Sequence, residues 1–351
     1  MPSPTPKDTI NSRQRYLCIV ASSVLLLLCL AVANLAYGSM PIPFADVAAA
    51  IFGKTGEDSL TETIVLDSRL PQMLTSILAG ASLATAGLLM QTVFANPLAD
   101  PSILGVGTGA GLGVAVVMLV MGGSAAGIGF ALSGFLLTAA AAFIGAMAVI
   151  GCLMALQRLM PGRLMLLVAG VMLSFVGSSF ISLINFWSTA QGVQSYFMWG
   201  LGTFGSLSLP QIPVVAALTL VALAAAWLMA KPLDALLLGD DYATGLGVNV
   251  RRVHSLVLLL TGVLVAITTA VCGPITFIGL AVPHLARLLT KNATHHRLLP
   301  LTMVWGANVA LACNILAHLP GDRGLLPINT LTPLVGVPVV FYLLIRQRNR
   351  Q

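Results

Sequence analysis

The chain contains the tripeptide Gly53-Lys54-Thr55, whose residue types hold phosphate groups in nucleotide-binding loops. Such a loop requires a further glycine five residues before Gly53, and Ala48 occupies that position. The alternating glycines of 105–113 do not satisfy the dinucleotide pattern G-x-G-x-x-G, and small residues of this kind favour close packing of membrane helices. Neither pattern predicts a nucleotide site in this chain.

The histidine and acidic residues show no arrangement typical of catalysis or metal binding. The apolar segments contain no Ser/His/Asp cluster, no His-x-x-x-His pair and no pair of carboxylates. We expect His284, beside Pro283, to bond backbone carbonyls that the proline leaves free, and His254, His295 and His296 to lie at the cytoplasmic surface. The sequence predicts no metal site, no bound cofactor and no enzymatic activity of the chain itself.

Two long runs, 101–157 and 164–230, contain no Asp, Glu, Lys or Arg. Each is longer than the roughly 20 residues that cross a bilayer, and the whole chain is 58% hydrophobic and 8% charged. These features predict an all-α polytopic membrane protein, so the net charge of +6 need not indicate a nucleic-acid partner. No carboxylate lies deep in an apolar segment, which counts against an ion-coupled secondary transporter.

Charges, prolines and glycines divide the apolar sequence into ten candidate transmembrane helices. Their ranges are 16–37, 71–94, 103–121, 130–156, 164–186, 213–230, 253–271, 275–290, 298–317 and 325–345. With both termini inside, only Lys54, Arg69 and Arg323 fall outside, so 14 of the 17 Lys and Arg residues are cytoplasmic. The expected organisation is a cytoplasmic tail (1–15), a ten-helix domain (16–345) with a cytoplasmic segment at 231–252, and a second tail (346–351).

Three stretches then carry a family resemblance. The first comprises Arg69-Leu70-Pro71, the small residues of 80–87 and Asn96-Pro97-Leu98-Ala99-Asp100-Pro101; the others are 238–248 and 273–287. In order and spacing they resemble the FecCD-type permeases of bacterial ABC importers for ferric siderophores, heme and cobalamin, over nearly the whole chain.

This resemblance implies a homodimer in the bacterial inner membrane, with helices two to five and seven to ten forming an inverted repeat. It also implies two cytoplasmic ATPase subunits, which bind ATP and Mg, and a periplasmic or lipid-anchored binding protein. The expected function is permease of a metal-chelate importer, with ferric siderophore as the first interpretation and heme or cobalamin as alternatives. An ion-coupled transporter is the less favoured reading.

The segment 231–252 has two short apolar patches around glycines, a pattern that predicts two short helices joined by a sharp turn. The resemblance makes this segment the element that docks on the ATPase; an ordinary interfacial helix is the alternative. The candidate coupling residues are Leu238, Gly239, Ala243, Gly245, Leu246 and Gly247.

Further candidate site residues are expected at the cytoplasmic side, at the outer side and along the transport pathway. At the inner mouth, Asn96, Leu98 and Pro161 are candidate gate residues, although Asn96-Pro97-Leu98 also suits a simple turn. Outside, the cations Arg69, His318 and Arg323 suit docking to an acidic binding protein, or else contact lipid headgroups or nearby carboxylates. Polar residues spaced along one segment predict either pathway lining or helix packing: Ser178, Ser182 and Asn185.

Overall fold

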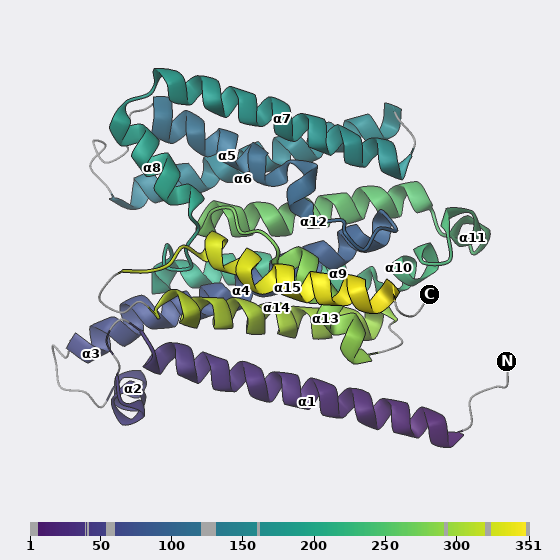
Figure 1. Ribbon diagram of the computed structural model, residues 1–351, viewed down its shortest axis with the longest axis horizontal. Helices are drawn as coiled ribbons and strands as arrows, with labels where there is room; N and C mark the ends of the chain where they lie inside the picture. Colours follow the sequence, from purple (N-terminus) through teal and green to yellow (C-terminus); the bar gives the residue numbers. More distant parts are fainter. Residues whose placement is uncertain are drawn as a thin grey trace.

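The structure is a computed structural model that describes residues 6–38, 40, 42–53, 60–120, 131–159, 162–290, 294–319 and 324–348. Over these ranges the chain is all-helical, with no strand. Its long helices run side by side along the long axis of the molecule (Figure 1). Seven of the described helices are long and apolar enough to cross a membrane, and the apolar stretches Val106–Val120 and Ile278–Thr290 are shorter.

Each of the ten predicted segments contains a helix. In order, these are α1 (Pro6–Ala36), α4 (Leu70–Val93), α5 (Val106–Ala115), α6 (Ala131–Leu159), α7 (Arg163–Trp187), α9 (Ile212–Leu228), α12 (Val250–Cys272), α13 (Ile278–Thr290), α14 (His295–Ala317) and α15 (Ile328–Arg348).

Shorter elements lie between them. On one side of the bundle these are α2 (Phe44–Ile51), α3 (Leu60–Thr63), the π-helix η1 (Ile64–Arg69) and α8 (Ala190–Gly200). The 3-10 helix η2 (Pro101–Leu104) precedes α5, the π-helix η3 (Val116–Val120) follows it, and the 3-10 helix η5 (Leu209–Gln211) precedes α9. The predicted segment 231–252 holds α10 (Ala230–Leu236) and α11 (Asp240–Gly245).

Several predicted helix ends differ from the observed ones by a few residues. The eighth helix begins at Ile278 rather than at residue 275, because Gly273 and Phe277 have positive φ values of 75° and 69°, which a right-handed helix does not accommodate. Helix α1 begins at Pro6, so residues 6–15 of the expected tail are helical, while the candidate membrane span within it is Arg13–Ala36, close to the predicted 16–37.

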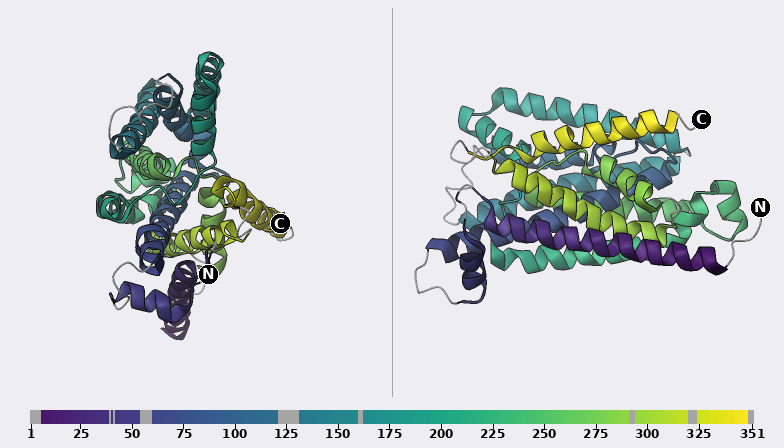
Figure 2. Two further views of the ribbon diagram at one scale, coloured as in Figure 1. Left: turned by 90° about the vertical axis from the view of Figure 1, so that its left-hand side faces the viewer. Right: turned by 60° about the horizontal axis from the view of Figure 1, so that its bottom comes forward.

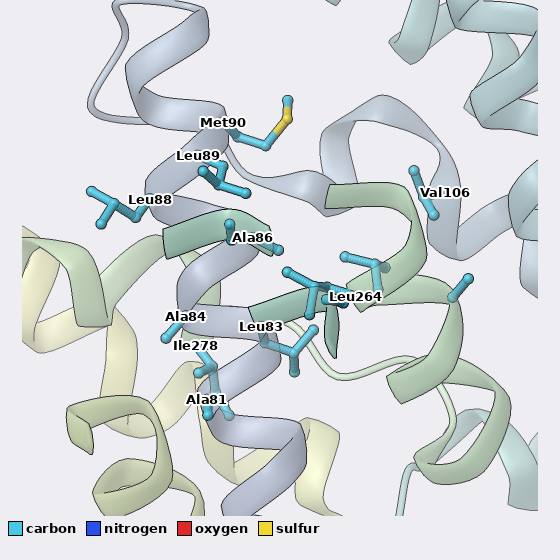
Figure 3. Close-up of a cluster of buried hydrophobic side chains, with 14 of the residues drawn as sticks. Ala81, Leu83, Ala84, Ala86, Leu88, Leu89, Met90, Val106, Leu264 and Ile278 are labelled. Atoms are coloured by element: carbon cyan, nitrogen blue, oxygen red, sulfur yellow. The ribbon is translucent and has the colours of Figure 1, made fainter. Parts of the chain in front are cut away.

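Helix α4 lies at the centre of the bundle. It packs against α9, α12, α13 and α14, and 19 of its 24 residues are buried. Figure 3 shows side chains from opposite faces of α4, such as Leu83 and Leu88, surrounded by neighbouring helices. Glycines allow the closest approaches, because a Cβ at Gly80 would collide with the carbonyl of Gly306 and one at Gly87 with that of Gly279.

The two ends of the bundle carry different elements. The first turn of α1, the last turn of α15 and the α10–α11 segment share one end, whereas α2, α3 and α8 lie at the other (Figures 1 and 2). This arrangement is the one that the predicted topology requires. Which end faces the cytoplasm rests on the charge distribution and stays a prediction.

Candidate functional site

The segment between α9 and α12 forms two short helices joined by a tight turn, as the sequence predicts. Gly239, with φ 103°, separates α10 from α11, and Gly247, with φ 81°, ends α11. The amides of Gly247 and Val248 donate to the carbonyls of Thr244 and Ala243, which is the Schellman pattern of helix termination. Glycine is required at position 247 because that motif places its residue in the left-handed region.

This segment exposes large apolar side chains at the end of the bundle. Leu238 is 63% exposed and Leu246 is 59% exposed, and they are joined by Leu237 and Tyr242. Ala243, by contrast, is fully buried and packs α11 onto the bundle, so it supports the exposed residues from within; its part in coupling stays a prediction. Tyr242 was not among the residues expected on this surface, because its outward direction depends on where Gly239 turns the chain.

The candidate gate turn follows α4 and has a defined geometry. Ala95 has φ 46°, and the amides of Ala95 and Asn96 donate to the carbonyls of Thr92 and Gln91, again in the Schellman pattern. The Asn96 carboxamide then accepts from the amide of Leu98 at 2.9 Å. The turn is therefore locally stabilised, and Leu98 is 43% exposed. Pro161 lies outside the described residues.

Two polar contacts from α13 hold this region. The His284 Nε2 donates to the Pro97 carbonyl at 2.8 Å. The expectation that this ring bonds a carbonyl left free by Pro283 is therefore wrong, because its partner lies in the candidate gate turn, 187 residues away in sequence. Arg287 donates to the side-chain oxygen of Gln91, whose amide nitrogen donates to the Leu280 carbonyl at 3.2 Å. Through these bonds the C-terminal end of α4 and the turn are held against α13.

A third contact joins α4 to the α10–α11 segment through His295. Its Nδ1 and its backbone amide lie 2.7 and 2.8 Å from the carboxylate of Asp234 on α10, and its Nε2 lies 2.8 Å from Thr92 Oγ1. His295 is 1% exposed, so the prediction of a surface position is wrong. Burial of this ring is compensated because both of its nitrogens have partners.

The predicted outer docking cation Arg69 is buried. Its Nη1 donates to the carbonyls of Leu35 and Ala36, both at 2.8 Å, and its Nη2 donates to the Met40 carbonyl. Only 7% of Arg69 is exposed. The expectation of an outward-facing cation is therefore wrong; the guanidinium satisfies carbonyls at the end of α1 that have no partner within the helix.

The other outer residues do not form a cationic patch with it. His318 is partly buried, and its Nδ1 donates to the carbonyl of Asn314, one turn earlier in α14. Arg323 lies outside the ranges that the structure describes. The role of these residues in docking a binding protein stays a prediction.

The polar stripe predicted for pathway lining lies on α7, at the edge of the bundle (Figure 2). Ser178 and Ser182 are exposed, and Ser182 Oγ donates to the Ser178 carbonyl at 3.0 Å. Asn185 is partly buried, and its Oδ1 has no hydrogen-bond partner among the described residues. Large apolar residues such as Phe175 and Phe180 are also exposed on α7, so this chain leaves most of the helix uncovered.

Comparison with known proteins identifies the family. A model of the FecCD transport family matches residues 25–346. The chain belongs to the FecCD transport family. Similar proteins include the hemin transport system permease protein HmuU of Yersinia pestis, 32% identical over 97% of this chain and 99% of that protein. The ferric enterobactin transport system permease protein FepD of Escherichia coli is 36% identical over 95% of this chain and 96% of its own length.

Two further proteins extend the comparison. The vitamin B12 import system permease protein BtuC of Klebsiella pneumoniae is 36% identical over 80% of this chain and 82% of its own. A metal-chelate type ABC transporter solved in an inward-facing conformation is 29% identical, with a TM-score of 0.79 over 94% of this chain and 99% of that chain. This FecCD family member is thus a multi-pass inner-membrane protein and an importer permease of the ABC type.

One buried carboxylate of the permease was not anticipated from the sequence. Asp100 is 7% exposed and lies against Gly279, close to the midpoint of α4. It is the N-cap of η2, and one of its oxygens accepts from both the amide and the hydroxyl of Ser102. Asp100 lies between two predicted apolar segments and not within one, so the prediction of no carboxylate inside an apolar segment is not contradicted, and helix capping gives this buried carboxylate a structural role.

Proposed function

We propose that this chain is the membrane permease of a binding-protein-dependent ABC importer that moves a ferric siderophore across the inner membrane. The observation that carries the substrate class is the 36% identity to the ferric enterobactin permease over nearly the full length of both proteins. The chain itself binds no cofactor in this proposal. A partner subunit binds ATP and Mg and hydrolyses the nucleotide.

The partner ATPase docks on the α10–α11 segment. Leu238 and Leu246, with Leu237 and Tyr242, expose apolar side chains on this segment, which lies at one end of the bundle (Figure 1). An exposed apolar cluster at such a place suits a groove in a partner protein. Asp234 of α10 is bonded to His295, and His295 to Thr92 of α4, so movement of the docked segment reaches α4 through directly bonded side chains.

The gate lies at the turn that follows α4. Asn96 fixes the turn and Leu98 projects from it, while His284 holds the Pro97 carbonyl from α13. A second copy of the chain, facing the uncovered side of α7, completes the pathway. Ser178 and Ser182 then line it, because they lie on that uncovered helix.

Uptake by the reconstituted complex tests the substrate. The permease, its ATPase and its binding protein are placed in liposomes containing ATP, and uptake of iron-labelled siderophore, heme and cobalamin is measured in parallel. We expect ATP-dependent uptake of the ferric siderophore alone. Uptake of heme or cobalamin instead would replace the siderophore assignment while leaving the importer class intact, and the hemin relative makes heme the main alternative.

A further inference from the structure

A cavity of about 180 Å³ lies where η2 and the start of α5 meet α4, α12 and the turn before α13. Its lining residues are Leu83, Asp100, Pro101, Ser102, Gly107, Thr108, Val265, Thr269, Pro274, Ile275, Thr276 and Gly279. A water molecule takes up roughly 30 Å³ of the liquid, so the cavity has room for a small ion with several waters. Its polar side chains are one carboxylate and four hydroxyls.

The carboxylate of this cavity belongs to Asp100, and only one of its oxygens has a partner. Oδ1 accepts from the amide and the hydroxyl of Ser102. Oδ2 has no hydrogen bond to any described residue, and it lies 2.9 Å from the point that a Cβ on Gly279 would occupy. The lining contains no Lys, Arg or His. A buried carboxylate without a positive partner is costly, so the unpartnered oxygen indicates an occupant from solution.

Two threonine hydroxyls of the lining also lack partners. Thr269 lies in the last turn of α12 and is 3% exposed, and Thr108 lies in the second turn of α5. Neither hydroxyl has a hydrogen bond to a described residue. The hydroxyl of Thr276 donates to Asn329 Oδ1 at 2.9 Å, which leaves its own oxygen able to accept. The cavity therefore offers oxygen atoms of the kind that bind hard cations.

The helix ends at the cavity favour the same charges. Gly279 is in the first turn of α13, whose partial positive charge stabilises an ionised Asp100. The cavity also borders the C-terminal end of α12, where the partial negative charge favours a cation. Pro274 follows that end and has no amide to donate to its carbonyls.

From this geometry we propose that the cavity binds a monovalent metal cation, Na⁺ or K⁺. Asp100 Oδ2 and the hydroxyls of Thr108 and Thr269 contact the ion, and water supplies the remaining ligands. A divalent ion would keep an uncompensated charge, because the lining has a single carboxylate. A proton would neutralise Asp100 but would use neither threonine.

The bound ion joins η2, which follows the candidate gate turn, to the end of α12. It therefore stabilises the position of the chain between α4 and α5. The ion stays in its site and is not carried across the membrane, so the site does not depend on the proposed substrate or on coupling to ATP.

Salt titration of the purified full-length chain in a neutral detergent tests the site. Choline chloride is replaced stepwise by NaCl, KCl or MgCl₂ at constant ionic strength, and the unfolding midpoint and the binding of radioactive sodium are measured. We expect NaCl or KCl, and not MgCl₂, to raise the midpoint in a saturable way. Asp100→Asn should abolish this response and the sodium binding, while asparagine still caps η2. Asp46→Asn, at an exposed position, removes the same charge and should respond as the wild type does.

A matched pair on α12 tests the hydroxyl ligand. Thr269→Val should weaken sodium binding by about threefold to tenfold, as expected for the loss of one polar contact. Thr268→Val is the control, because the Thr268 hydroxyl donates to the Leu264 carbonyl at 2.9 Å and does not line the cavity. If Asp100→Asn does not fold, this pair and sodium binding by the wild type still decide.

A full response in Asp100→Asn, or equal losses in the two valine variants, would overturn the site. A midpoint that ignores both monovalent salts would also overturn it, and a rise on acidification would then assign a proton to Asp100. An equal effect of MgCl₂ would overturn the monovalent assignment.

Discussion

Arg69, His284 and His295 illustrate how single polar side chains stabilise this membrane bundle. Each is buried, and each bonds a backbone carbonyl or a carboxylate from another segment. In an apolar environment, removing one partner leaves the other without a hydrogen bond, and water does not replace it. Substitution of these residues should therefore affect stability before it affects contact with any partner.

We expect Arg69→Ala to lower the stability of the permease by about 2–3 kcal/mol, because carbonyls at the end of α1 lose a charged donor. Thermal unfolding in detergent measures the change, and Asp67→Ala, at an exposed neighbouring position, is the control. If Arg69→Ala unfolds like the wild type but binds the binding protein more weakly, the docking role is correct and the helix-end role is not.

His295→Leu should cost about 1–3 kcal/mol, because Thr92 Oγ1 and the partly exposed Asp234 carboxylate lose the imidazole while the carboxylate keeps the backbone amide of residue 295. His296→Leu is the matched control. His296 is exposed, and its ring contacts the tilted ring of Trp227 with 4.9 Å between the two ring centroids. Unfolding midpoints of both variants are compared with the wild type. Equal midpoints for the two leucine variants would contradict the importance of the Asp234–His295–Thr92 contact.

At the scale of elements, α4 is the helix on which the others are arranged. Its glycines bring backbones together, and no side chain can be added there without separating two helices. Gly87→Ala should lower stability by about 1–3 kcal/mol, because its Cβ meets the Gly279 carbonyl of α13. Gly151→Ala on α6 has open space around its new Cβ and should be neutral in the same unfolding assay. A neutral Gly87→Ala would show that α13 can move away from α4 without cost.

The α10–α11 segment is expected to act through its exposed apolar surface. Leu246→Asp places a charge in a contact that excludes water, and we expect it to abolish ATP-driven transport while the permease keeps its unfolding midpoint. Gly247→Pro should have a similar effect, because proline fixes φ near −65° whereas Gly247 has φ 81°. Normal copurification with the ATPase and normal transport by Leu246→Asp would place the coupling contact elsewhere.

At the scale of the whole molecule, α1, α15 and the α10–α11 segment are directed to one end. The charge distribution predicts that this end is cytoplasmic, with ten transmembrane segments. Reporter fusions after Gln351 and within 58–68 should give cytoplasmic and external signals, respectively. An external signal from the C-terminal fusion would refute the topology.

The sequence by itself predicted the membrane class, the ten apolar segments and the two-helix form of 231–252. Hydropathy, charge and glycine-dependent turns act over a few neighbouring residues, so they can be read directly from the chain. The family resemblance added the expected partners. The predicted start of the eighth helix was wrong because Phe277, which is not a glycine, has a positive φ.

Only the tertiary structure decided which polar residues are buried and what they bond. His295 and Thr92 are 203 residues apart in sequence, and Arg69 is 34 residues from Leu35, yet each pair is in hydrogen-bond contact. Arg158 and Arg251 likewise come from separate helices, and the Arg251 guanidinium donates to the Arg158 carbonyl at 3.4 Å. A charged or polar residue near a helix end has the same local sequence whether it faces water or another helix, because its environment is set by how distant segments pack.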